Sequence, residues 1–392
     1  MSHYNKEMVS FFLTTACNLN CVYCYTNKES YPEQILDLAF AKKLISDYGT
    51  NDCFSDCKKI VRFFAAGEPT LNFNAMAEIV SFAKQQYGES IEVELQTNGI
   101  FTTAYGNFNL ELAEWIAANV DYIWISCDGT PDIQNKYRPL FIPHYKRKPL
   151  LTSSEIVEES IKFLTGSCKK MTGVRLTILN DNLYRQREMI DYFYHLGIRD
   201  IWADPIFPSV GNKAAYEEID LDIFAEQFLD ACEYASSFGI DSSDSRYDKV
   251  IYGSNYTCNF DEKTKHYCRA CKPVPHATTD GFITSCDMAM FREPDGSQSS
   301  HLNSLLFGAW DSEKQMINYD QEKIDILRKR NVEEMDHCRN CDAKFGCGGY
   351  CLGEVTNETG TMHGVLPHKC SVVRKLYREM NDRQRKYRFT HP

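Results

Sequence analysis

Six short apolar runs alternate with helical segments over the first half of the chain, and this alternation constrains the fold most strongly. The runs are rich in β-branched and aromatic residues and cover residues 8–14, 60–65, 91–95, 122–126, 174–179 and 201–203. The segments between them have the apolar spacing of amphipathic helices and cover residues 33–48, 75–87, 110–118, 154–164 and 186–196. Strands that alternate with helices predict a parallel sheet with helices on its outer face. Handedness and neighbour rules curve such a sheet toward a barrel.

Three cysteines follow the first apolar run in a C-x3-C-x2-C spacing. They are Cys17, Cys21 and Cys24, and Tyr23 directly precedes the third. A loop of this length can place three thiolates on three irons of one four-iron cluster, which leaves the fourth iron open to a small molecule. Tyr23 can cover a flat ligand beside such a cluster. A zinc knuckle or buried free thiols are the competing interpretations of this motif taken alone.

Composition and charge exclude several classes of protein. The net charge of −11 argues against non-specific nucleic-acid binding, which needs a basic surface. The N-terminal residues lack the apolar segment of a secretory signal, and no apolar run approaches the ~20 residues that span a membrane. We therefore expect a cytoplasmic protein with no nucleic-acid or membrane partner. Thiols stay reduced in the cytoplasm, so the 17 cysteines point to metal rather than to disulfides.

A second group of cysteines lies in the last third of the chain. A C-x2-C pair is followed by Gly281 and one cysteine, then by a C-x2-C-x5-C-x3-C block and a final cysteine. These are Cys268, Cys271, Cys286, Cys338, Cys341, Cys347, Cys351 and Cys370. Eight thiolates can hold two four-iron clusters, and two zinc sites would also satisfy them. The cysteines outside both patterns are expected to be core or surface thiols: Cys53, Cys57, Cys127, Cys168 and Cys232.

These motifs resemble the radical S-adenosylmethionine (radical SAM) family, whose signature is C-x3-C-x-aromatic-C after the first barrel strand. The tail resembles the SPASM extension of radical SAM enzymes that modify peptides and proteins. The resemblance implies an α/β fold: a partial (β/α)6 barrel over residues 1–207 and a small cysteine-rich SPASM domain over residues 258–392. Residues 208–257 are predicted to bridge them through a helix at 221–238 and a loop. A charged helix is expected at 371–388.

The resemblance also implies the cofactors, which are three [4Fe–4S] clusters and S-adenosylmethionine. The first cluster would use the three N-terminal cysteines. One auxiliary cluster would use Cys268, Cys271, Cys286 and Cys351. The second would use Cys338, Cys341, Cys347 and Cys370. Cys258 is a rival to Cys268 as the upstream ligand, because families vary at that position.

Polar residues gather where the predicted strands end, which is the edge where parallel βα folds carry their chemistry. The family pattern Gly-Gly-Glu-Pro appears after the second strand with Ala66 in place of the first glycine. Gly67 allows close approach of a ligand, and Glu68 can accept a hydrogen bond from an ammonium group. Turn formation is the alternative role for these loop residues. The expected contacts to S-adenosylmethionine are Tyr23, Gly67, Glu68, Asn98, Ser126, Arg138 and Arg175.

Two of these contacts, Arg138 and Arg175, can each reach a methionine carboxylate, although arginines more often form salt bridges or lie at the surface. Ser126 and Asp128 match the Ser-x-Asp-Gly that the family often shows after the fourth strand. Ser126 is the better candidate for a cofactor contact, and Asp128 is expected only to shape the turn.

The resemblance implies that a 5′-deoxyadenosyl radical, formed by reductive cleavage of S-adenosylmethionine, modifies a peptide or protein. We favour a maturase of ribosomally made peptides. An anaerobic sulfatase-maturating enzyme, which forms formylglycine, is the alternative. The general base of that class follows the cysteine of the Gly-x4-Cys element and would be Asp287 here; a turn or helix-capping aspartate is the competing interpretation.

The expected partners are a peptide or protein substrate and an external electron donor of the ferredoxin or flavodoxin type. The chain reaches its first predicted strand at Met8, so we expect capture of the substrate by the barrel and tail or by a separate peptide-recognition protein. Two other classes remain: an iron–sulfur electron-transfer protein and a zinc-dependent binding module. A pure electron carrier has no need of the polar residues at the strand ends.

Overall fold

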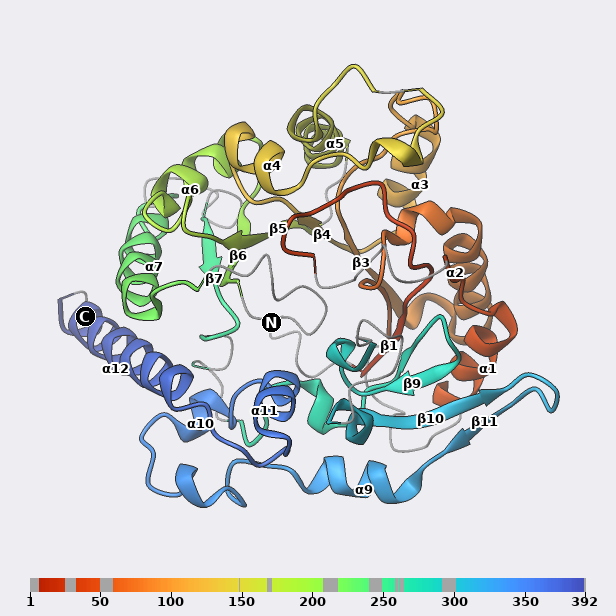
Figure 1. Ribbon diagram of the computed structural model, residues 1–392. Helices are drawn as coiled ribbons and strands as arrows, with labels where there is room; N and C mark the ends of the chain where they lie inside the picture. The colour runs from red at the N-terminus through yellow and green to blue at the C-terminus, as the bar shows by residue number, and fades with distance from the viewer. Residues whose placement is uncertain are drawn as a thin grey trace.

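A computed structural model describes residues 7–24, 33–49, 59–147, 149–167, 171–206, 218–239, 249–257, 260, 264–290 and 301–390. Within these residues the chain forms one curved sheet of 11 strands. Helices surround this sheet on its outer side (Figure 1). No helix in the described part of the chain combines the length and the hydropathy needed to cross a membrane.

The first six strands pair in parallel and in chain order. They are β1 (Glu7–Phe11), β2 (Lys59–Phe63), β3 (Ile91–Thr97), β4 (Tyr122–Ser126), β5 (Met171–Ile178) and β6 (Asp200–Pro205). The helices of this half are α1 (Leu38–Gly49), α2 (Phe73–Tyr87), α3 (Leu110–Asn119), α4 (Pro131–Tyr137), α5 (Ser153–Ser167), α6 (Gln186–His195) and α7 (Leu221–Ala235). The predicted α/β class with a parallel sheet is confirmed.

Two helices, α1 and α4, depart from the prediction for local reasons. Helix α1 begins at Leu38 rather than at residue 33, because Asp37 accepts a hydrogen bond from the backbone of Ala39 at 2.7 Å and caps the helix. Helix α4 was not predicted. It has only seven residues and begins at Pro131, whose fixed φ suits the first turn.

Alternation along the strands separates an apolar core from a polar interior. Residues such as Val61, Val93 and Ile125 are fully buried against the helices. The next residues along each strand face the opposite way and include charged groups. Arg62 lies 2.9 Å from Glu94 on the neighbouring strand, and the Arg175 guanidinium lies between two tryptophans. The barrel interior is therefore lined by polar and aromatic side chains.

The tail continues the barrel sheet. Strand β8 (His276–Ala277) pairs in parallel with β1. Strands β9 (Phe282–Thr284), β10 (Leu306–Asp311) and β11 (Met316–Tyr319) follow as antiparallel partners. At the other edge, β7 (Ile251–Gly253) pairs in parallel with β6, inside the region predicted as a bridge.

The helices of the tail lie between the two edges of the sheet (Figure 1). They are α9 (Gln321–Lys329), α10 (Lys344–Cys347), α11 (Leu352–Thr359) and α12 (Pro367–Thr390). The final helix α12 includes the predicted span and packs on α7, where Lys375 lies 3.0 Å from Glu226. The stacked rings of Phe40 and Trp310 join α1 to β10. The barrel and the tail thus share one continuous framework.

Candidate active site

The loop after β1 carries Cys17, Cys21 and Cys24. Backbone hydrogen bonds hold it to the loop after β2 and to the last residue of α4. The amide of Glu68 donates to the carbonyl of Ala16 at 2.8 Å. The amide of Val22 donates to the carbonyl of Tyr137 at 2.9 Å. These bonds fix the cysteine loop to the ends of β2 and α4, so the predicted ligands of the first cluster lie at the carboxyl edge of the sheet.

The loop after β2 approaches the cysteine loop so closely that only glycine fits at position 67. A Cβ on Gly67 would overlap the carbonyl oxygen of Ala16. Ala66, which stands where the family has glycine, adopts a φ of 61° in the left-handed region. An alanine pays for this conformation in backbone strain that glycine avoids.

Glu68 is buried and braces the ends of neighbouring strands. Its Oε1 accepts from the hydroxyls of Thr70 at 2.8 Å and Thr97 at 2.6 Å, and Oε2 accepts from the amide of Asn98 at 2.7 Å. Burial raises the pKa of Glu68, and these hydrogen bonds oppose that rise. A carboxylate oxygen has two lone pairs, so Oε2 can accept one further donor.

Asn98 is bound to the cysteine loop through its side chain. Its amide nitrogen donates to Asn18 Oδ1 at 2.7 Å and lies 3.6 Å from Cys17 Sγ, while its oxygen accepts from the amide of Ile100. Asn18 is fully buried, and no sequence pattern singled it out. Asn98 therefore orients the sulfur of a predicted cluster ligand, and its expected contact to S-adenosylmethionine stays a prediction.

Asp128 does more than shape a turn. This fully buried carboxylate accepts from the Tyr23 hydroxyl, from Arg138 Nε at 2.9 Å and from the amide of Thr177 at 3.1 Å. Arg138 in turn places Nη1 3.9 Å from Cys21 Sγ, and its guanidinium lies 5.3 Å from the centre of the Tyr23 ring. Burial raises the pKa of Tyr23 well above its usual value. Asp128 thus connects two predicted cofactor contacts to the cysteine loop.

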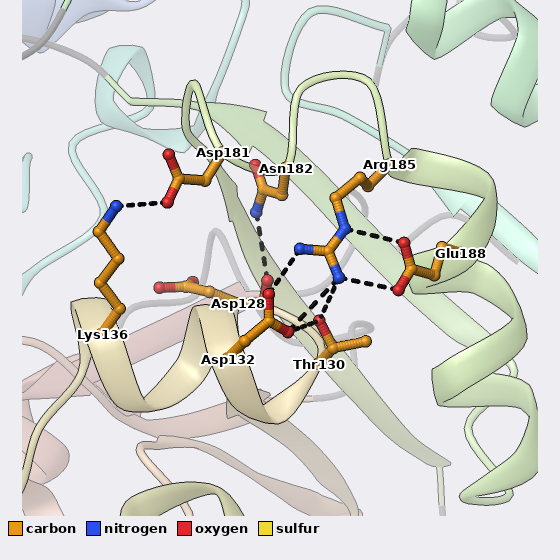
Figure 2. A network of polar contacts seen from close by, with 8 residues as sticks. All are labelled: Asp128, Thr130, Asp132, Lys136, Asp181, Asn182, Arg185 and Glu188. Carbon is orange, nitrogen blue, oxygen red and sulfur yellow. Dashed lines mark hydrogen bonds and ion pairs between the residues drawn. The ribbon is translucent and has the colours of Figure 1, made fainter.

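A second polar network holds the turn that contains Asp128 (Figure 2). The amide nitrogen of Asn182, a fully buried residue, donates to the carbonyl of Asp128 at 3.2 Å. Nearby, Arg185 contacts Asp132 at 2.7 Å and Glu188 at 2.8 Å, and so joins α4 to the start of α6. Lys136 on α4 bonds to Asp181. The network fixes the loop after β5 against the end of β4.

The remaining predicted contacts lie on adjacent strands. Ser126 ends β4 and is paired in register with Arg175 of β5. The Arg175 guanidinium lies 5.9 Å from the ring centre of Trp124 and 5.6 Å from that of Trp202, with Nη2 3.9 Å from Asp204 Oδ2. Arg175 is therefore held in the barrel interior. The roles of Ser126 and Arg175 in binding a cofactor stay predictions.

In the tail, the cysteines of the first predicted auxiliary site come from three separate segments. Burial raises the pKa of Cys286, and the neighbouring Asp287, Cys351 and Cys268 raise it further. The Asp287 carboxylate lies 3.6 Å from Cys286 Sγ. The sulfur of the fourth cysteine, Cys271, lies 3.6 Å from Nη1 of Arg330. Cys258 lies outside the described residues, so its rivalry with Cys268 stays open.

The second predicted auxiliary site surrounds a cavity of about 180 Å³. Its four cysteines all line this cavity: Cys338, Cys341, Cys347 and Cys370. Burial raises the pKa of Cys338 to about 11 and that of Cys347 to about 12. Bound metal would offset this cost of the thiolate form, since a coordinated thiol loses its proton.

The spacing of these side chains bears on the choice between zinc and clusters. In the described part of the chain, no three histidine, cysteine or carboxylate side chains converge closely enough to share one metal ion. Zinc needs its sulfurs at about 2.3 Å from a single ion, whereas a four-iron cluster spreads its cysteines over separate irons. The choice between zinc sites and clusters stays a prediction, which the metal content of the protein will decide.

Of the cysteines predicted to be ordinary thiols, Cys127 and Cys232 lie in or against the core. Cys127 Sγ is 3.7 Å from the carbonyl of Gly129, and Cys232 Sγ is 3.6 Å from that of Tyr252. Cys53, Cys57 and Cys168 lie outside the described residues.

The sequence model of the radical SAM superfamily matches residues 11–193. An uncharacterized protein of Methanocaldococcus jannaschii is 31% identical over 198 residues, which are 50% of this chain and 61% of that protein. The chain thus spans less than two thirds of this relative. The radical SAM cyclopropyl synthase TigE of Paramaledivibacter caminithermalis is 21% identical over 97% of this chain and 75% of that protein. A cysteine-type anaerobic sulfatase-maturating enzyme of Clostridium novyi is 31% identical over 31% of this chain and 32% of that enzyme.

Two solved structures share the fold over nearly the whole chain. The enzyme anSMEcpe with bound AdoMet has a TM-score of 0.69 at 15% identity, covering 96% of this chain and 97% of that one. Streptococcus suis SuiB bound to precursor peptide SuiA has a TM-score of 0.60 at 13% identity, covering 93% and 76%. The matched family model covers the cysteine loop and the strand ends that surround it, so residues 11–193 are a radical SAM domain.

Proposed function

We propose that this radical SAM enzyme modifies a side chain or backbone carbon of a peptide or protein, as a maturase of ribosomally made peptides, and holds three [4Fe–4S] clusters. The observation that carries the proposal is the pairing of one open-site cysteine loop on the barrel with two sets of four cysteines in the tail. Two solved structures of this fold support it, because SuiB is bound to a precursor peptide in one and anSMEcpe to a Cp18Cys peptide in the other.

The family implies a [4Fe–4S] cluster and S-adenosylmethionine, and the residues at the carboxyl edge fit both. Cys17, Cys21 and Cys24 would hold three irons, and donors from Asn98 and Arg138 already face two of the sulfurs. Hydrogen bonds to cluster sulfurs are one means by which proteins tune such sites. When bound, the cofactors supply a radical that can take hydrogen from an unactivated carbon.

The chain's own residues would bind and orient the cofactor. Glu68 Oε2 has room for one donor, so we assign it the methionine ammonium group. Gly67 leaves the approach to the loop unobstructed, and Ser126 and Arg175 would face the methionine carboxylate from adjacent strands. Tyr23 would lie against the cofactor, since Asp128 and Arg138 hold its ring in place.

The substrate would bind in the polar interior of the barrel. Trp124 and Trp202 flank Arg175 there, and the pair Arg62–Glu94 lies on β2 and β3. Flat aromatic and charged side chains of this kind suit a peptide, which offers both backbone amides and side chains. An electron donor of the ferredoxin or flavodoxin type would reduce the enzyme, and a separate recognition protein remains a candidate partner.

The test of the proposal uses anaerobic, dithionite-reduced protein with S-adenosylmethionine and a short peptide encoded next to its gene. We expect 5′-deoxyadenosine, methionine and a change in peptide mass. Reduced protein with intact clusters that forms no 5′-deoxyadenosine would instead support the electron-transfer alternative. Formation of 5′-deoxyadenosine with a modified sulfatase peptide, and none with the neighbouring peptide, would replace the first candidate by the second.

The second candidate, formation of formylglycine in a sulfatase, rests on Asp287. Its carboxylate lies 3.6 Å from Cys286 Sγ, at the position of the base in sulfatase-maturating enzymes. A general base removed by Asp287→Asn should cost roughly 10²–10⁴-fold in product formation, while S-adenosylmethionine is still cleaved and the iron content is unchanged. Product at the wild-type rate would leave Asp287 as a turn residue.

A further inference from the structure

Arg330 is a fully buried arginine in the cysteine-rich tail. It follows the last residue of α9 and is the largest of the side chains that are completely shielded from solvent. A guanidinium does not lose its proton in proteins, so this position holds a permanent positive charge. Burying a charge is costly unless an opposite charge compensates it.

The protein partners of Arg330 provide hydrogen bonds but no negative charge. Nη2 donates to the carbonyl of Gly349 at 2.7 Å, and Nε donates to the carbonyl of Met362 at 3.1 Å. Longer contacts reach the carbonyls of Gly348 and Tyr350 at 3.5 Å. Among the residues that the structure describes, its remaining contact is a sulfur, Cys271 Sγ, at 3.6 Å from Nη1.

The guanidinium lies between the two predicted auxiliary sites. Cys271 belongs to the first set, and the carbonyls of residues 348–350 lie on the short segment that joins Cys347 of the second set to Cys351 of the first. Gly349 has a φ of 88°, and a Cβ there would lie 3.3 Å from Nη1. A residue without a side chain therefore allows the guanidinium to lie flat against this segment.

We propose that Arg330 is the counter-ion of the two auxiliary clusters and raises the reduction potential of both. The inference rests on the proposed three-cluster function. A four-iron cluster held by four thiolates is an anion, and reduction adds one more electron to it. A fixed cation beside the sulfurs favours the reduced form, and the guanidinium takes up no proton when the electron arrives.

The test compares Arg330→Gln with Arg330→Lys in anaerobically reconstituted full-length protein. Glutamine removes the charge but keeps a donor for the Gly349 carbonyl, and lysine keeps the charge without the planar fork. Arg328→Gln is the matched control, because Arg328 lies in α9 two residues before Arg330, is mostly exposed and is 4.0 Å from Asp325. The first readout is the iron content per chain. The second is the midpoint potential of each cluster, measured by a redox titration that electron paramagnetic resonance monitors.

We expect Arg330→Gln to shift both auxiliary potentials to more negative values, or to lose auxiliary iron, while the barrel cluster is unchanged. Arg330→Lys should restore iron and most of the potential, and Arg328→Gln should match the wild type. Full iron with unchanged potentials in Arg330→Gln overturns the inference, as does failure of Arg330→Lys to restore what Arg330→Gln loses. Wild-type protein that holds only one cluster would defeat the three-cluster proposal itself.

Discussion

Asp128 concentrates three hydrogen bonds on one buried carboxylate, from Tyr23, Arg138 and Thr177. In Asp128→Asn the amide cannot neutralise Arg138, whose side chain is 11% exposed. Breaking a buried ion pair costs about 3–5 kcal/mol, and we expect a loss of that order in the free energy of unfolding, measured by anaerobic denaturant titration.

The control for Asp128→Asn is Asp230→Asn, which breaks the exposed pair of Arg187 and Asp230. That change should cost at most about 1 kcal/mol. Equal losses in the two variants would show that the buried pair does not hold the site.

Asp200 gives a pH dependence that can be checked. Its Oδ1 is shielded from solvent and has no hydrogen-bond partner among the described residues, and burial raises its pKa to about 6 while Arg175 opposes the rise. In the unfolded chain an aspartate titrates near ~3.9. The folded state therefore binds its proton more tightly, and ionised Asp200 destabilises the fold above pH 6.

Asp200→Asn should accordingly be more stable than the wild type at pH 8, by up to about 3 kcal/mol for a pKa difference of two units. The difference should shrink as the pH falls through 6 and vanish near pH 4. Thermal unfolding between pH 8 and 5 measures it, and a difference that grows on acidification would contradict the assignment.

At this scale, residue types and spacing were enough to propose the cysteine ligands, because their pattern is local in the sequence, and their roles stay predictions. The partners of Asp128 were not predictable, since Tyr23 lies 105 residues away and meets it only in the folded chain. Arg330 was missed because a single arginine at the end of a charged helix has no sequence signal. Arg330 is buried by residues of the tail that are distant from it in the sequence.

Among the elements, the two loops after β1 and β2 depend on one another. Gly67→Ala would drive a Cβ into the carbonyl of Ala16 and displace the cysteine loop. We expect it to lose the barrel cluster, about one third of the iron, and with it the cleavage of S-adenosylmethionine. Iron analysis and chromatography of 5′-deoxyadenosine measure both.

Ala66→Gly is the matched variant, since it relieves a left-handed alanine beside Gly67. It should keep all iron and change stability by no more than about 1 kcal/mol in the favourable direction. Full iron and full cleavage in Gly67→Ala would show that the close approach of the two loops is not required.

Long, periodic elements were predicted well, and short ones were missed. Strand β4 has the predicted bounds and α3 differs by one residue, because each carries several apolar positions in phase. Strands β7 and β8 have three and two residues, too few for a period to show. Their existence depends on pairing with β6 and β1, which no local pattern records.

For the whole molecule, the tail closes around the barrel by extending its sheet. Trp310 Nε1 donates at 3.0 Å to Asp37, the residue that caps α1, and Lys375 on α12 reaches α7. The tail, which carries the predicted auxiliary sites, is thereby attached to the barrel at both of these helices. This arrangement suits a tail that exchanges electrons with a substrate bound in the interior.

The measurement that tests this account most directly is the iron and sulfide content of the anaerobically reconstituted wild-type chain. Eleven placed cysteines predict about 12 irons and an equal amount of sulfide, falling by about one third when Cys17, Cys21 and Cys24 are all replaced by alanine. A chain with about four irons, or one with two zinc ions in its tail, would contradict it.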